Sequence, residues 1–178
     1  MPFARAYTGV GRGTSSPAGD EGGPGIGNRR REGAVARVSN LLESKGTGVA
    51  TVAPDATVAA VVAELARLRI GALVVSADGA HIDGIVSERD VVQRLHQLRG
   101  DLLDEPVSSI MSRAVETCAP TDDLDSLMRT MTERRVRHLP VVADGVLCGI
   151  VSIGDVVKQR IGELERDRHE LLEYITAR

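Results

Sequence analysis

The fold is decided by residues 135–157, which read RVRHLPVVADGVLCGIVSIGDVV. Val136 to Ala143 is apolar and rich in β-branched side chains, which is typical of a buried strand. Asp144-Gly145 provides the positive-φ residues of a tight hairpin turn. Leu147 to Val151 then predicts the return strand, and Ser152 stands at the start of a helix. The stretch therefore predicts strand, turn, strand and helix.

The same unit occurs earlier in the chain. Residues 70–79 (IGALVVSADG) align with 136–145, and 49–54 (VATVAP) with 115–120 (VETCAP), both 66 residues apart. Residues 84–92 (GIVSERDVV) align with 149–157 at a separation of 65, and the one-residue slip fits the hairpin turn. A period near 65 is too long for a solenoid repeat and suits a duplicated small domain. The chain therefore contains two tandem copies.

Each copy predicts a β-α-β-β-α unit, so the fold class is α+β/α/β, with two such units packed as a pseudo-symmetric pair. We expect a first domain over 34–100, which includes a preceding helix, and a second over 101–178 with an extended C-terminal helix. The predicted elements are a helix over 35–45, strand 49–52, helix 57–68, strands 70–75 and 82–86, helix 88–98, a helical turn at 108–111, strand 115–118, helix 123–134, the hairpin, and a helix from 153 to about 175.

Composition narrows the function classes. Residues 1–37 hold six Arg and three acidic residues (+3), and the remainder holds 16 Lys and Arg against 22 Asp and Glu (−6), which sum to the net charge of −3. This balance argues against general nucleic-acid binding. The Arg-rich tail nevertheless leaves DNA binding as a weaker hypothesis. No apolar run approaches the ~18 residues that span a bilayer, and no signal-type segment follows Met1. We therefore expect a cytoplasmic protein without a membrane partner.

The N-terminal region has the composition of a disordered tail. Residues 1–33 carry nine of the 19 glycines, together with Pro, Ser and the run Arg29-Arg30-Arg31. Such a segment cannot bury enough apolar surface to fold. A later translation start, for example at Val35 or Val38, is the alternative.

Cys118 and Cys148 lack the spacing of a metal site and have no His cluster beside them. Both lie in predicted strands, and free Cys is among the most often buried residue types. Two buried thiols are therefore the expected arrangement, with a redox pair as the alternative.

Both copies carry the motif Gly-Ile-Val-Ser-x-x-Asp where the second hairpin strand enters a helix. The structural interpretation is a capping box, in which Ser87 or Ser152 caps the helix and Asp90 or Asp155 reaches back. The functional interpretation uses the same geometry. A helix N-terminus offers free N–H groups and partial positive charge, and a carboxylate held there can accept both hydroxyls of a ribose.

The sequence from about Val49 to Arg160 resembles the cystathionine β-synthase (CBS) domain family, arranged as a tandem pair or Bateman module. The residues that carry the resemblance are Thr51 and Thr117 before Pro54 and Pro120, His138-Leu139-Pro140-Val141, and both Gly-Ile-Val-Ser-x-x-Asp runs. In particular, the sequence is similar to small stand-alone bacterial proteins that consist of a CBS pair. The resemblance implies a sensor that binds AMP, ADP, ATP, NAD(H) or an S-adenosyl ligand between the two copies.

By that resemblance Asp90 and Asp155 hold ribose hydroxyls, and Arg137 and His138 contact phosphate, for which a forked guanidinium and a protonated imidazole are suited. A surface Arg-His pair is the structural alternative. The implied ligand-binding set is Thr51, Ala72, Ser87, Arg89, Asp90, Thr117, Arg137, His138, Leu139, Pro140, Ser152 and Asp155.

The first copy departs from the pattern, because Gly71-Ala72-Leu73-Val74 stands where the second has Arg137-His138-Leu139-Pro140. A nucleotide there needs Arg69, Arg89 or, across the cleft, Arg137 for its phosphates. We expect two unequal sites, with the first in more doubt.

No catalytic constellation, metal site or P-loop is present in the sequence, so we expect no enzyme and no catalytic cofactor. The leading hypothesis is a regulatory adenine-nucleotide sensor that changes its dimer or partner contacts, with an unknown regulated protein. The alternative is a structural or interaction scaffold with vestigial sites. The resemblance also implies a homodimer, and the charged last helix is either solvated or faces a partner in that dimer.

Overall fold

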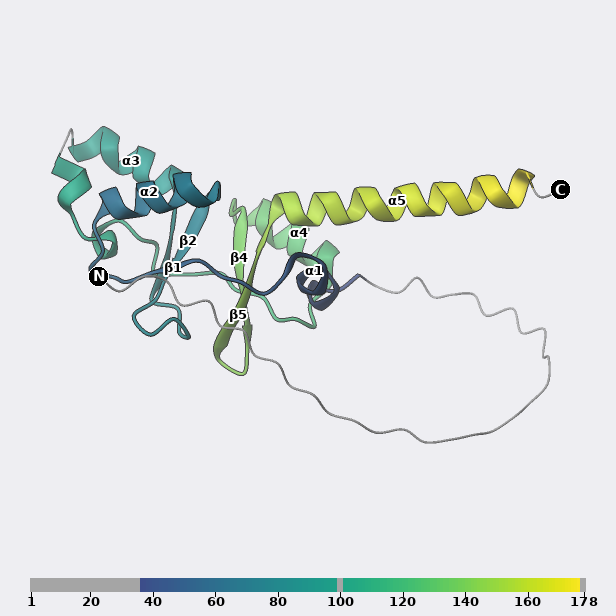
Figure 1. Cartoon of the computed structure of the whole chain (residues 1–178), viewed down its shortest axis with the longest axis horizontal. Coiled ribbons are helices and arrows are strands. Elements are labelled where there is room, and N and C mark those ends of the chain that lie inside the picture. The colour runs from purple at the N-terminus through teal and green to yellow at the C-terminus, as the bar shows by residue number, and fades with distance from the viewer. Residues whose placement is uncertain (1–35, 99–100, 177–178) are drawn as a thin grey trace.

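The computed structural model describes residues 36–98 and 101–176, so the predicted disordered tail lies outside the described residues. The elements alternate as the tandem repeat predicts (Figure 1). In chain order they are α1 (Val38–Lys45), β1 (Thr51–Val52), α2 (Val58–Leu68), β2 (Ala72–Val75), β3 (Gly84–Ser87), α3 (Glu88–Leu98), the 3-10 helices η1 (Asp101–Asp104) and η2 (Val107–Ser109), α4 (Leu124–Glu133), β4 (His138–Ala143), β5 (Val146–Ser152) and α5 (Ile153–Thr176).

The first copy forms a three-stranded sheet in the order β1-β2-β3. β1 pairs parallel with β2, which places Thr51 beside Val74, and β2 pairs antiparallel with β3, which places Ala72 beside Ser87. All four residues of β2 are buried. The Thr57 side chain caps α2 by accepting the Ala60 N–H at 3.2 Å. The middle strand thus brings its N-terminal end next to the Ser-x-x-Asp motif of the same copy.

The second copy has a two-stranded sheet, β4-β5, and the strand predicted over 115–118 is reduced to one bridge between Cys118 and Val141. Pro140 accounts for this difference. In the first copy the Val74 N–H donates to the Ala50 carbonyl at 3.3 Å. Pro140 occupies the position of Val74 and has no N–H, so the corresponding hydrogen bond to Glu116 cannot form.

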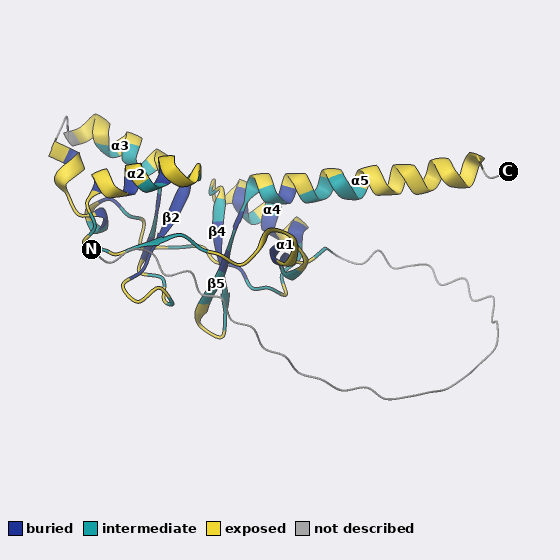
Figure 2. Ribbon diagram, viewed as in Figure 1, coloured by how far each residue is buried: buried dark blue, intermediate teal, exposed yellow. Residues whose placement is uncertain are grey.

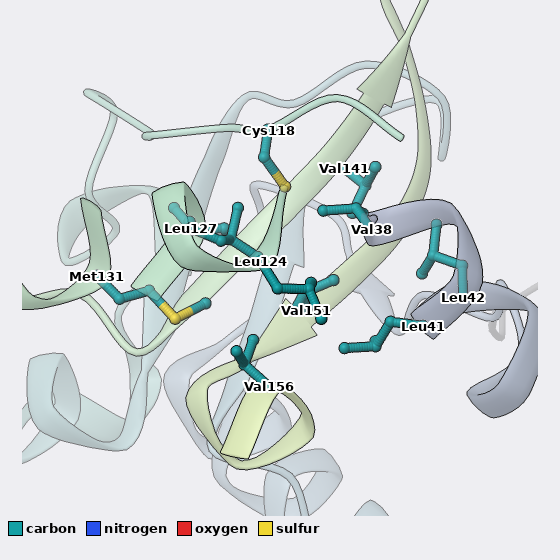
Figure 3. Packing of buried hydrophobic residues seen from close by; sticks show 11 residues of the cluster. Val38, Leu41, Leu42, Cys118, Leu124, Leu127, Met131, Val141, Val151 and Val156 are labelled. Atoms are coloured by element: carbon teal, nitrogen blue, oxygen red, sulfur yellow. The ribbon is translucent and has the colours of Figure 1, made fainter. Parts of the chain in front are cut away.

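The segments that precede each copy pack against the other copy. α1 contributes Val38, Leu41 and Leu42 to the hydrophobic cluster of the second copy, beside Leu124 and other core residues (Figure 3). The connector between the copies contributes its buried apolar residues to the cluster of the first copy; these are Leu102, Val107 and Ile110. The expected division at residue 100 therefore separates the repeats along the sequence, whereas the two cores exchange their flanking segments.

The last helix extends well beyond the body of the second copy. α5 has 24 residues and ends at Thr176, which confirms the predicted extended helix. Its first turns lie beside α4, and its C-terminal half is exposed on all sides (Figure 2). Within the part of the chain that the structure describes, no helix combines the length and apolarity needed to cross a membrane.

Both cysteines are free thiols that point into protein. Cys118 Sγ contacts the Pro140 carbonyl at 3.8 Å, and Cys148 Sγ donates to the Val141 carbonyl at 3.4 Å. Burial raises the pKa of the Cys118 thiol to about 12 and also raises the pKa of Cys148. Protonated, partly buried thiols are poor nucleophiles, which favours the structural role over the redox pair.

Candidate functional site

Each Ser-x-x-Asp motif lies where a hairpin strand runs directly into a helix. In the first motif (Ser87–Asp90), Asp90 Oδ2 accepts the Ser87 backbone N–H at 2.8 Å and the Ser87 Oγ hydroxyl at 2.6 Å. In the second motif (Ser152–Asp155), Asp155 Oδ2 accepts the same two donors of Ser152, each at 2.8 Å. The Asp155 N–H returns a bond to Ser152 Oγ at 3.2 Å. The capping box is confirmed in full for the second motif, whereas the first motif shows only the half in which Asp90 reaches back to Ser87.

Capping engages one oxygen of each carboxylate. Across residues 36–98 and 101–176, no protein group donates a hydrogen bond to Oδ1 of Asp90 or Asp155. A carboxylate oxygen can accept more than one hydrogen bond, and bonds to an ionised acceptor are stronger than neutral ones. The capping role therefore leaves room for a ligand hydroxyl on the same carboxylate.

The second motif carries an additional partner. Lys45, the last residue of α1, donates from Nζ to Asp155 Oδ2 at 2.6 Å and to the Ile150 carbonyl at 2.9 Å. The two side chains are 30% and 27% exposed, so the pair lies at the surface but is partly covered. Burial acts to raise the pKa of Asp155, but the hydrogen bonds from Lys45 and Ser152 outweigh it, and the pKa lies below its ordinary value. The second carboxylate is thus already paired with a cation.

A pocket of about 240 Å³ lies between the two copies at the first motif. One wall comes from the first copy and holds Ala72, Ile85 and the first motif. The other wall comes from the second copy, from the approach to Cys118 and the start of β4. The residues of this inter-copy pocket are Gly71, Ala72, Ile85, Ser87, Glu88, Arg89, Asp90, Ser112, Ala114, Val115, Glu116, Arg135, Val136, Arg137 and His138.

Arginine side chains give the pocket its cationic groups. Arg89 comes from α3, and Arg135 and Arg137 come from the segment that enters β4. Arg89 Nη1 lies 3.4 Å from the Arg135 carbonyl oxygen, a contact that joins the two copies across the pocket. Glu88 and Glu116 stand among them, so the charge is mixed. In this pocket, only the guanidinium groups of the arginines offer a phosphate two donors in a forked geometry.

His138 and Gly71 are in close contact at the floor of the pocket. A Cβ on Gly71 would lie 3.0 Å from His138 Cε1 and 3.4 Å from Nε2, which is tighter than ordinary packing. Glycine at position 71 therefore lets the imidazole reach over the first copy. Burial lowers the pKa of His138, although the carboxylates of Asp155 and Glu88 act in the opposite direction. A neutral imidazole still offers one N–H donor, but the protonated form expected from sequence is disfavoured.

The pocket brings together half of the residues predicted from sequence: Ala72, Ser87, Arg89, Asp90, Arg137 and His138. Leu139 is fully buried in the hydrophobic cluster of the second copy, and Pro140 is also buried. Thr51 is half-buried in β1 and Thr117 is exposed, and neither lines the pocket. Arg137 and His138, expected to favour the second copy's site, line the pocket at the first motif, although His138 also lies beside Ser152 of the second motif. The better-formed site is the one that the sequence left in more doubt.

Sequence reasoning missed the roles of three residues near the motifs. Arg135 has φ 56°, and its counterpart Arg69 has φ 54°; Arg69 is the C-cap of α2, and Arg135 follows the C-cap of α4. A left-handed residue at a helix end is usually Gly or Asn, so the sequence carried no signal for it. Lys45 is separated from Asp155 by 110 residues, and no local pattern relates them.

Comparison with known proteins follows the fold closely. The family model for the CBS domain matches residues 45–97 and 107–162. The solved structure of a CBS-domain-containing protein from Agrobacterium tumefaciens is 42% identical, with a TM-score of 0.68, and covers 70% of this chain and 99% of its own. The solved structure of a CBS domain protein of Pyrobaculum aerophilum complexed with AMP is 34% identical, with a TM-score of 0.60, and covers 67% of this chain and 88% of its own.

A curated relative is similar over most of both chains. The mitochondrial CBS domain-containing protein CBSX3 of Arabidopsis thaliana is 31% identical over 146 residues, which is 78% of this chain and 71% of that protein. The residue ranges that the family model matches contain both Ser-x-x-Asp motifs and both hairpins.

Proposed function

Because the chain belongs to the CBS domain family and carries two CBS domains in tandem, we propose that it is a regulatory, non-catalytic sensor that binds an adenine nucleotide in the inter-copy pocket. The observation that carries the proposal is the first motif, where Asp90 Oδ1 accepts no protein hydrogen bond within the described residues and three arginines line the same pocket. The AMP complex of the Pyrobaculum relative supports the ligand class.

The chemistry of the pocket suggests how a nucleotide is held. The ribose hydroxyls donate to Asp90 Oδ1, beside the Ser87 hydroxyl. The phosphate accepts from Arg89 and Arg137, and His138 adds one N–H donor. Ile85, Ala72, Val115 and Val136 provide apolar surface for the adenine ring.

The size of the pocket favours a small nucleotide. Its volume of about 240 Å³ lies just under the roughly 300 Å³ at which small-molecule sites commonly begin. A mononucleotide, AMP first, therefore fits the space better than NAD(H), which needs further opening of the pocket.

Sensing requires two states with different affinity for the ligand. Both copies supply walls of the pocket, so a bound nucleotide stabilises the arrangement in which Arg89 and Arg137 lie on opposite sides of the phosphate. We propose that this arrangement changes the contacts of a homodimer or of an as yet unknown regulated protein. The second candidate, a scaffold with vestigial sites, is favoured by the Lys45–Asp155 pair, which leaves the second carboxylate engaged by the chain itself.

The test is calorimetric titration of the full chain with AMP, ADP, ATP, NADH and S-adenosylmethionine. We expect saturable binding of an adenosine phosphate and a loss of about 10–100-fold in affinity in Asp90→Ala, because charge-assisted hydrogen bonds are removed. Asp155→Ala is the matched control, since it removes the same capping bonds in the other copy. It should bind at the first motif like the wild type.

Two outcomes would contradict the proposal. If a protein shown to be folded bound none of the five ligands, the scaffold hypothesis would be favoured over the sensor. Binding that is lost in Asp155→Ala and kept in Asp90→Ala would place the ligand at the wrong motif.

A further inference from the structure

The C-terminal half of α5 is a helix without neighbours among the described residues. Residues 164–176 project beyond α4 and α1 (Figures 1 and 2), over about 20 Å at 1.5 Å per residue. Leu164, Leu171 and Ile175 are each more than 60% exposed. A helix this short is marginal in water by itself, because most helical stability in proteins comes from packing an apolar face.

Most exposed apolar residues of α5 follow one seam, and Leu172 and Tyr174 lie on either side of it. Val157, Ile161, Leu164, Leu171 and Ile175 are separated by steps of four, three, seven and four residues. Arg168 divides the seven-residue step into four and three, so the seam alternates four and three over its whole length. This is the spacing of a coiled coil, with one polar residue in the core positions. α5 thus has the pattern of a helix that packs against another helix.

The charges beside the seam identify the other helix. We propose that α5 pairs antiparallel with α5 of a second copy of this chain, so that Ile161 lies against the partner's Leu164 and Leu164 against the partner's Ile161. In this register Lys158 faces the partner's Glu165, and Arg160, which also pairs with Asp125 and Glu163 of its own chain, faces the partner's Asp167. Two-fold symmetry repeats both pairs, so all four flanking contacts join opposite charges.

Other arrangements of two copies are less favourable. A parallel pair in register places Arg168 against the partner's Arg168 in the core of the seam. An antiparallel pair shifted by one heptad places Asp167 against the partner's Asp167 and Glu165 against the partner's Glu165. Each of these contacts sets like charges side by side, which specifies against that alignment.

This inference rests on the proposed homodimer and names its interface. The first test is the mass of the full chain in solution by light scattering, over a dilution series. We expect a dimer for the wild type and a dissociation constant about 100-fold higher for Leu164→Glu, because a charge then lies in the apolar core of the seam. Arg166→Glu, on the opposite face of the same turn, is the matched control and should dimerise like the wild type.

A monomeric wild-type chain would overturn both the dimer and its seam. A dimer that survives Leu164→Glu unchanged would overturn the seam alone. Nucleotide titration of the same variants separates these failures from a failure of the sensor, because the inter-copy pocket lies outside α5.

A charge exchange tests the orientation. Lys158→Glu and Glu165→Lys should each weaken the dimer severalfold, and the double variant should recover the wild-type affinity, because Lys158 and Glu165 face each other only in the antiparallel register. A parallel pair would bring Glu165 to Arg160 instead, so the double variant would stay weak. Failure of the double variant to recover would overturn the antiparallel arrangement.

Discussion

The two Ser-x-x-Asp motifs share the two bonds that each aspartate accepts from its serine, and they differ in the segment that crosses the adjacent strand. In the first copy the Ile85 carbonyl accepts the backbone N–H of Ser112 at 2.9 Å. In the second copy the equivalent Ile150 carbonyl accepts the ammonium of Lys45, also at 2.9 Å. The Ser112 N–H makes no hydrogen bond to Asp90, whereas the Lys45 ammonium also donates to Asp155. Two copies with the same motif thus become one open site and one site paired with the chain itself.

The source of this difference lies in the linkers that precede the two copies. Each crossing segment belongs to the linker before the other copy: 36–45 packs on the second copy and 101–112 on the first. The linkers are related in sequence, because Val38-Ser39-x-Leu41-Leu42 corresponds to Val107-Ser108-x-Ile110-Met111, but Ala114 stands where the first linker has Lys45. What distinguishes the two motifs is therefore set by α1 and the connector, and the predictions below act on these segments in order of expected effect.

The largest effect concerns the packing of α1 on the second copy. Leu41 is 2% exposed within the second cluster, so Leu41→Ala should lower the free energy of unfolding by about 2–5 kcal/mol through lost burial and a cavity. Urea denaturation followed by circular dichroism measures it. Glu43→Ala, on the exposed side of the same helix, should change stability little. Equal stability of the two variants would mean that α1 does not hold the second copy.

The next effect compares the two left-handed arginines. Glycine lacks the Cβ that makes this conformation costly, by roughly 1–2 kcal/mol, so Arg69→Gly and Arg135→Gly should each raise the unfolding free energy by about 1 kcal/mol. Only Arg135 lines the inter-copy pocket, so only Arg135→Gly should also weaken nucleotide binding. Thermal denaturation and titration of both variants check this. Equal binding by the two would remove Arg135 from the site.

The smallest effect on stability concerns Lys45 itself. The pair is partly exposed, so Lys45→Ala should lower the unfolding free energy by only about 0–1 kcal/mol. Its effect on binding should be clearer, because the variant frees Asp155 for a second ribose. We expect calorimetric stoichiometry to rise from one nucleotide per chain toward two. An unchanged stoichiometry would show that the second motif lacks a site even without the lysine.

The contribution of this pair should depend on pH. The pKa of Asp155 lies below its ordinary value, which is about 3.9, so the folded chain binds that proton less readily than the unfolded chain. The stabilisation is therefore complete above about pH 5 and is lost as the pH falls through the folded pKa. The stability difference between wild type and Lys45→Ala should shrink toward zero in the same range. A difference that persists below the folded pKa of Asp155 would point to packing of the lysine stem instead.

Local patterns in the sequence predicted most elements of the fold. The Asp144-Gly145 hairpin has φ of 51° and 80°, as its turn residues indicate, and α5 ends within a residue or two of its predicted end. The predicted length of the strand over 115–118 was wrong, because Pro140 in the neighbouring strand lacks the N–H that would pair with Glu116. Which strand lies beside 115–118 cannot be read from a local pattern. The exchange of flanking segments and the Lys45–Asp155 contact join residues far apart in sequence, and periodicity carries no information about such partners. For the same reason, the sequence identified the motifs but not which of them is open.

The most direct test of the central claim is a crystal structure of the full chain grown with AMP. The account predicts the nucleotide in the inter-copy pocket, with its ribose hydroxyls on Asp90 Oδ1, its phosphate between Arg89 and Arg137, and the Lys45–Asp155 pair intact. A ribose bound to Asp155 in place of the lysine ammonium, with the pocket at Asp90 empty, would contradict it.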